Sequence, residues 1–250
     1  MAYPESQRVK FYAVPLGQDL EMIVYGHGGK PVLVFPSQDG VAADYNGFGM
    51  IDSVWDRVVR GDLQFFCIDS VDRRTVSDIY GNAYDRIRIY ETWYNYVINA
   101  MVPKMLEING TGKKPLVTGV SMGAYHAANF FFRRPDIFDS VIALSGLYET
   151  DSMYGGYMDE VVYANDPIKS LGGMPTDHKY IELYNHDDII ICVGQGAWED
   201  GMLASTRELQ RVMAQKGITA WVDYWGYDVN HDWPWWRKQF PYFINILLSR

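Results

Sequence analysis

The chain has 250 residues, of which 48% are hydrophobic and 21% charged, so it is long and apolar enough to fold around a core of its own. Its formal net charge is -9 and its lysines and arginines never form a long run, which excludes the basic surface that a nucleic-acid partner requires. The N-terminal residues carry charges where a secretion signal would be apolar, and no later apolar run reaches the roughly 20 residues of a membrane span. We therefore expect a cytoplasmic protein with neither nucleic acid nor a membrane as a partner.

Three strands are expected in the first forty residues, over 8–14, 19–26 and 31–36, with a glycine-rich turn between the second and third. From residue 51 onward, helical patterns alternate with short apolar runs. The expected helices span 51–61, 87–110 with a kink at Pro103, 121–134, 203–217 and 236–250, and the expected strands span 63–70, 115–121, 138–146, 188–196 and 219–226.

This alternation predicts an α/β fold in which a mostly parallel sheet of eight strands, with an antiparallel edge, is covered by helices on both faces. We expect one domain over residues 1–250, with residues 147–188 as a small cap insertion over the cleft. Cys67 and Cys192 each lie inside an expected buried strand, which predicts two free, buried thiols.

The motif Gly119-Val120-Ser121-Met122-Gly123 stands where an expected strand turns into an expected helix. A nucleophile elbow needs this setting, because small residues allow the serine a strained backbone and the helix start faces the developing oxyanion. Ser121 is the candidate nucleophile.

A serine hydroxyl needs a base, and five histidines are available. His231 follows the last expected strand and lies at the sheet edge where Ser121 is expected. We expect His27 in a solvated turn, His126 packed in the core, and His178 and His186 in or beside the insertion.

The acid that orients the histidine should come between serine and histidine in chain order. Glu199 and Asp200 follow the penultimate strand, and we favour Asp200 with Glu199 as the reserve. Glu149 and Asp151 remain as a further alternative after the preceding strand, whereas Asp232 is expected to cap the last helix.

The oxyanion hole should take one N–H from Met122 and a second from the loop after the third strand. Ser37 and Gln38 are both candidates for that second donor, and position does not separate them.

A resemblance to a known family is carried by GVSMGAYHAANFFFRRPDIFDSVIALSG, PVLVFPSQDG, LQFFCIDSVD and HDWPWWRKQFPYFINILL. These segments resemble the putative-esterase branch of the α/β-hydrolases, which includes esterase D-like enzymes, feruloyl esterases and mycolyltransferases. The resemblance implies an α/β-hydrolase fold with Ser121 as nucleophile, Asp200 as acid and His231 as base. The Ser37-Gln38-Asp39 loop departs from the small or aromatic residues that relatives often carry there.

The predicted function is a serine esterase that cleaves a short acyl or aryl ester, of a sugar or small alcohol, without cofactor or metal. An acyltransferase using the same acyl-enzyme and a non-catalytic binding module on this scaffold are the alternatives. Several aromatic residues lie on loops or in the insertion expected near the cleft, where exposed rings could stack on a sugar or phenolic group, but the favoured alternative is that most of them pack the cap onto the sheet: Tyr148, Tyr154, Tyr157, Trp198, Trp233 and Trp235.

Overall fold

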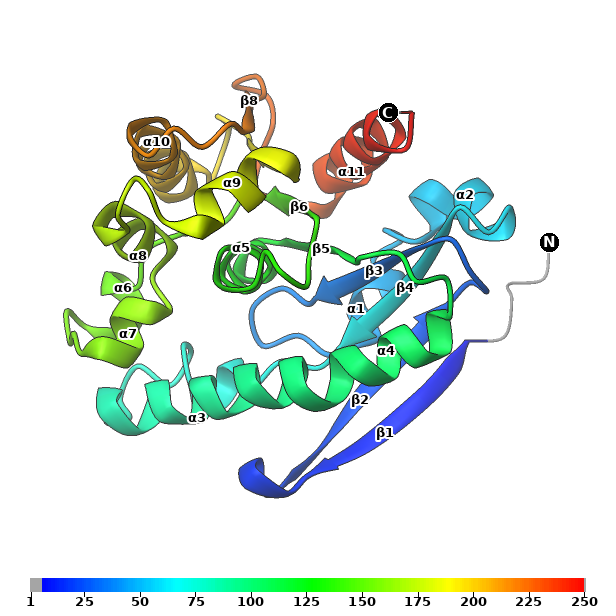
Figure 1. Cartoon of the computed structure of the whole chain (residues 1–250), viewed down its shortest axis with the longest axis horizontal. Coiled ribbons are helices and arrows are strands. Elements are labelled where there is room, and N and C mark those ends of the chain that lie inside the picture. Colours follow the sequence, from blue (N-terminus) through cyan, green and yellow to red (C-terminus); the bar gives the residue numbers. More distant parts are fainter. Residues whose placement is uncertain (1–5, 250) are drawn as a thin grey trace.

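A computed structural model of the chain describes residues 6–249 and shows an α/β arrangement around one sheet (Figure 1). The strands are β1 (Gln7–Ala13), β2 (Gln18–Tyr25), β3 (Lys30–Phe35), β4 (Leu63–Ile68), β5 (Leu116–Val120), β6 (Ser140–Leu144), β7 (Asp188–Val193) and β8 (Trp221–Tyr224). Their order in the 8-stranded sheet is β1-β2-β4-β3-β5-β6-β7-β8.

The strands β3 to β8 pair in parallel, while β2 pairs antiparallel with both β1 and β4. The predicted antiparallel edge is therefore confirmed, and so is the mostly parallel eight-stranded sheet. The turn between β2 and β3 contains Gly26 and Gly29, both at positive φ, as its glycine content indicates.

The helices cover both faces of the sheet, as predicted. The main helices are α2 (Trp55–Val59), α3 (Ala83–Tyr96), α4 (Val102–Asn109), α5 (Met122–Arg133), α10 (Asp200–Gln215) and α11 (Trp233–Leu247). Alternate strand residues belong to different clusters: Leu33 and Phe35 pack with α3, α4, α5 and α10, whereas Val32 and Val34 pack with α2 and α11. Among the described residues, no helix is long and apolar enough to cross a membrane.

Just before Pro103, where a kink is predicted, the structure has a π-helical turn, η4 (Val97–Met101), between α3 and α4, and the two helices lie end to end in Figure 1. Pro103 lacks an N–H and falls in the first turn of α4, where helix geometry leaves that donor unused. The widened turn before it lets one long helix continue past the proline.

Residues 147–188 form four short helices and no strand, namely α6 (Asp151–Tyr154), α7 (Glu160–Ala164), α8 (Pro167–Gly173) and α9 (Lys179–His186). Of these helices, α7 contacts α3, α8 contacts α5 and α10, and α9 contacts β7. Figure 1 shows the positions of α6 to α8 beside the larger helices. Cys67 and Cys192 are free and buried, as predicted.

Candidate active site

Ser121 occupies a sharp turn between β5 and α5 at the carboxyl edge of the sheet. Its φ of 56° and ψ of -122° lie in a region that non-glycine residues rarely adopt. The turn remains hydrogen-bonded to the neighbouring strand β6, since the N–H of Ser121 donates to the carbonyl of Leu144 at 2.9 Å. The backbone therefore has the elbow geometry that the Gly-x-Ser-x-Gly motif predicts.

The two glycines of the motif allow three segments to touch through their backbones. A Cβ on Gly119 would lie 2.3 Å from the carbonyl of Gly123, and a Cβ on Gly123 would lie 2.5 Å from the carbonyl oxygen of Phe35. Real Cβ atoms do not approach so closely. Only glycine at both positions lets α5 pack directly against β5 and against the end of β3.

His231 lies in the loop after β8, with its Nε2 2.9 Å from the Oγ of Ser121. The N–H of His231 donates to the carbonyl of Ala197 at 3.0 Å, which fixes the loop to the segment after β7. The indole of Trp236 meets the imidazole edge to face, with 4.9 Å between ring centroids. The structure thus brings the predicted base to the predicted nucleophile.

The other histidines lie elsewhere. His27 is exposed in the β2–β3 turn, and His178 and His186 lie at the two ends of α9. His126 is wholly buried on α5, as expected of a packed histidine.

The acid beside His231 is Glu199 and not Asp200, which corrects the preferred assignment. Nδ1 of His231 lies 3.3 Å from Oε2 of Glu199, a side chain that is 1% exposed. Asp200 is exposed and begins α10. Because Trp198 just before them has a φ of 68°, the chain turns so that Glu199 faces inward and its neighbour faces solvent.

The remaining acidic candidates are engaged away from His231. Glu149 accepts a hydrogen bond from the hydroxyl of Ser205, and Asp151 pairs with Lys169 at the surface. Asp232 caps α11, as predicted, by accepting the N–H of Trp233 at 2.7 Å.

Ser145, which sequence reasoning missed, holds the second oxygen of Glu199, and Trp236 in turn holds Ser145. The hydroxyl of Ser145 donates to Oε1 of Glu199 at 2.6 Å and accepts from Nε1 of Trp236 at 3.1 Å. Ser145 directly follows β6 and has a φ of 58°, which its side chain disfavours. Its position at the end of a parallel strand was the available signal, because that edge carries the other site residues.

A cavity of about 220 Å³ opens at Ser121 and His231. It is lined by Gln38, Ser121, Met122, Tyr125, Ser145, Leu147, Met202 and His231. Met122 is the first residue of α5, so its N–H has no partner within the helix. Of the two candidates for the second oxyanion donor, Gln38 lines this cavity and Ser37 does not.

Tyr125 contributes a ring to the cavity and keeps its hydroxyl away from it. Burial raises the pKa of Tyr125, and the protonated hydroxyl donates to the carbonyl of Asn165 at 2.8 Å. Its contribution to the cavity wall is therefore apolar.

The aromatic residues expected at the cleft are absent from the lining of this cavity. Tyr148 and Tyr154 are buried in the core, Tyr157 donates to Asp159, and Trp233 stacks on Phe48. Trp198 is 85% exposed, and the indole of Trp235 lies under the ammonium group of Lys238. Leu147 is the one residue of the 147–188 insertion in the cavity wall.

Comparison with known proteins settles the family. Residues 14–244 match the family described as "Putative esterase". The chain belongs to the putative esterase family. The resemblance read from the elbow and the C-terminal segment is thereby confirmed, and the chain is an esterase by family.

Solved structures of such esterases share the fold. A ferulic acid esterase superposes with a TM-score of 0.75 at 14% identity, covering 98% of this chain and 97% of its own. S-formylglutathione hydrolases from Agrobacterium tumefaciens (TM-score 0.73, 12% identity, 100% and 99% covered) and Staphylococcus aureus (0.72, 14%, 98% and 96%) are similarly close. No curated protein matches the chain in sequence. The likeness confirms the predicted α/β-hydrolase fold.

Within residues 6–249, no group of three or more His, Cys, Asp or Glu side chains could hold a metal ion.

Proposed function

We propose that this esterase hydrolyses its substrate through an acyl-enzyme on Ser121, with His231 as general base and Glu199 as the acid that orients it. One observation carries the proposal: His231 bridges Ser121 Oγ at 2.9 Å and Glu199 Oε2 at 3.3 Å. A carboxylate only accepts hydrogen bonds, so Glu199 selects the tautomer with the proton on Nδ1. Nε2 is then free to take the proton of Ser121.

Proton transfer to His231 accompanies attack by Ser121 Oγ on the ester carbonyl, and the imidazolium returns that proton to the leaving alcohol. Water then repeats the sequence and releases the acid. Glu199 stabilises the imidazolium in both halves while Ser145 holds its other oxygen in place.

The oxyanion is stabilised by the N–H groups of Met122 and Gln38 in this proposal. Both residues line the cavity at Ser121, and the N–H of Gln38 makes no hydrogen bond to another of the described residues. Loss of one such donor costs on the order of 10²–10³ in kcat. Ser37 is the less suitable of the two loop residues, because it does not line the cavity.

The substrate class that fits is a short acyl or aryl ester of a sugar or small alcohol. The cavity of about 220 Å³ is small, and Tyr125, Leu147 and Met202 give it apolar walls suited to an acyl group.

A fluorophosphonate probe and a panel of p-nitrophenyl esters with acyl chains of increasing length test this function. We expect labelling of the wild type at Ser121, faster hydrolysis of acetate and butyrate than of long-chain esters, and neither labelling nor turnover in Ser121→Ala. A folded wild type that resists the probe and leaves every ester intact would contradict the proposal.

Product analysis with added alcohol separates hydrolysis from acyl transfer. We expect the free acid to dominate. A transferred ester as the main product would make the enzyme an acyltransferase.

A further inference from the structure

The loop after β3 makes a strained turn at the edge of the catalytic cavity. The N–H of Gly40 donates to the carbonyl of Ser37 at 2.9 Å, which closes a four-residue turn around Gln38 and Asp39. Asp39 has a φ of 59°, in the left-handed region. Glycine adopts this conformation freely, and aspartate adopts it more readily than most residues but at some cost in backbone strain, which a hydrogen bond can offset.

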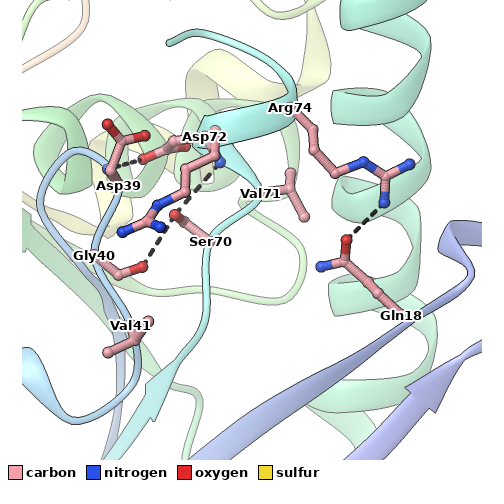
Figure 2. A pocket seen from close by; sticks show the side chains of 9 residues that line it. Gln18, Asp39, Gly40, Val41, Ser70, Val71, Asp72 and Arg74 are labelled. Atoms are coloured by element: carbon pink, nitrogen blue, oxygen red, sulfur yellow. Dashed lines mark hydrogen bonds between the residues drawn. The ribbon is translucent and has the colours of Figure 1, made fainter. Parts of the chain in front are cut away.

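The turn separates two cavities, although Gly40 at its end is buried and lies close to Pro36 and Asp44. Gln38 faces the catalytic cavity, whereas Asp39 and Gly40 line a second cavity of about 340 Å³ with Ser70, Asp72 and Arg74 (Figure 2). Hydrogen bonds also contribute to holding the turn, and one of them is made by the side-chain amide of Gln38, which donates to Oγ of Ser77 at 2.9 Å.

Asp72 supplies the bond that fixes the middle of the turn. The N–H of Asp39 donates to Oδ2 of Asp72 at 3.2 Å, and Ser70 holds the next residue by donating to the carbonyl of Gly40 at 3.2 Å (Figure 2). Asp72 is 1% exposed although its side chain is a carboxyl group. Burying a carboxylate is costly unless its oxygens find donors, so the placement requires an explanation.

The other oxygen of Asp72 connects the turn to the helix that follows the nucleophile. Oδ1 lies 3.0 Å from Nε2 of the wholly buried His126, on α5 five residues beyond Ser121. Nδ1 of His126 is in turn 2.9 Å from the hydroxyl of Tyr90 on α3. The carboxylate is thus fixed against the element that presents Ser121.

A carboxylate accepts hydrogen bonds and cannot donate them. Facing Asp72, the Gln38–Asp39 peptide can present its N–H but not its carbonyl, which would be repelled. Without that acceptor, the peptide loses the hydrogen bond that fixes its orientation, and a rotation that relaxes Asp39 to a negative φ also changes the backbone angle ψ of Gln38.

We propose that Asp72 is a positioning residue whose buried carboxylate holds the Ser37–Gly40 turn in its left-handed form and so places the N–H of Gln38 for the oxyanion. This inference rests on the proposed function. It concerns only how the second oxyanion donor is held.

The test compares Asp72→Ala with the double variant Asp72→Ala/Asp39→Gly on a p-nitrophenyl ester. In the single variant we expect kcat to fall by roughly tenfold to a hundredfold, with KM changed by less than about twofold. Affinity for a trifluoromethyl ketone, which forms an oxyanion at Ser121, should fall by a similar factor. Glycine at position 39 should restore most of both losses, because it keeps the positive φ without help.

The matched control is Asp44→Ala. Asp44 accepts the N–H of Val41 in the same loop at 2.9 Å but lies outside the turn, so kcat should stay within about twofold of the wild type.

A folded Asp72→Ala with unchanged kcat and inhibitor affinity would overturn the proposal. A loss that glycine at position 39 does not recover would also overturn it, since Asp72 would then act only through its contact with His126. Activity remaining in Ser121→Ala would instead defeat the proposed function.

One measurement needs no variant and covers the case in which Asp72→Ala does not fold. The amide of Asp39 in the wild type should exchange slowly with solvent for a loop residue, because a buried carboxylate accepts it. Exchange as fast as that of an unbonded surface amide would refute the bond on which the proposal depends.

Discussion

Glu199 and Asp187 carry carboxyl groups near opposite ends of β7, and the two groups differ in how they are buried and hydrogen-bonded. Glu199, beyond the carboxyl end, is almost wholly buried, and each of its oxygens faces a donor, on His231 and on Ser145. Asp187, just before the amino end, is half-buried, and its Oδ2 is buried without a hydrogen-bond partner. Burial, with a smaller contribution from the charge of Asp139, raises the pKa of Asp187 to about 6.

The difference shows what the donors at the catalytic edge achieve. A buried carboxylate that accepts two hydrogen bonds can stay charged and orient a histidine, whereas one that lacks a partner tends to take up a proton. The same strand therefore ends beside a carboxyl group with two hydrogen-bond partners and begins beside one whose pKa is raised by burial.

The largest effect on kcat is expected when the carboxylate of Glu199 is replaced by an uncharged amide. Glu199→Gln should lower kcat by about 10³ to 10⁴, because an amide can favour the wrong tautomer of His231. Asp200→Asn, one residue along the chain, is the matched control and should stay within about twofold. Steady-state kinetics on p-nitrophenyl acetate measures both, and the reverse order of effects would reinstate Asp200 as the acid.

Removing the second donor should have a smaller effect. Ser145→Ala and Ser145→Gly both delete the hydrogen bond to Glu199, and we expect kcat to fall by about tenfold or more in each, since a hydrogen bond to a charged group contributes about 1.5–3 kcal/mol.

Comparing Ser145→Ala with Ser145→Gly also separates the effect of the lost hydrogen bond on kcat from the effect of backbone strain on stability. Because Ser145 has a φ of 58°, the glycine variant should be more stable than the alanine variant by about 1 kcal/mol in urea unfolding. Full activity in both variants would show that Glu199 needs no second donor.

The smallest effect is expected at the other end of β7. Since the pKa of Asp187 is raised in the folded protein, the native state binds a proton more tightly than the unfolded chain, and the free energy of unfolding should fall as pH rises from about 4 to 6. Asp187→Asn should remove this part of the pH dependence and stabilise the protein at pH 7 by about 1 kcal/mol, a value reduced for the solvent exposure of the group.

Urea unfolding at pH 5 and pH 7.5 measures this change, and kcat should be unaffected because Asp187 lies at the sheet edge opposite the site. An Asp187→Asn variant with the same pH dependence as the wild type would contradict the raised pKa.

The sequence is most informative where a local pattern has a single structural solution. The strands follow from their apolar runs, and Ser121 follows from two glycines between a strand and a helix. His231 could be selected because its loop follows the last parallel strand, at the edge where Ser121 lies.

The acid could not be selected with the same certainty, because adjacent residues point in different directions and the turn depends on Trp198. A tryptophan at positive φ is not suggested by any sequence rule. Ser145 and Asp72 were missed for a related reason. Their roles come from tertiary hydrogen bonds to residues far along the chain, which no local periodicity encodes.

The contact of Gly119, Gly123 and the end of β3 has a consequence for how such an enzyme can evolve. Neither glycine can accept a side chain. Substitutions at these two positions therefore cannot shift Ser121 by small steps relative to the loop after β3. Variation that changes the substrate is left to residues such as Leu147 and Met202, which face the cavity from outside this contact. A designer seeking a new acyl specificity should begin with those two side chains and leave the glycines untouched.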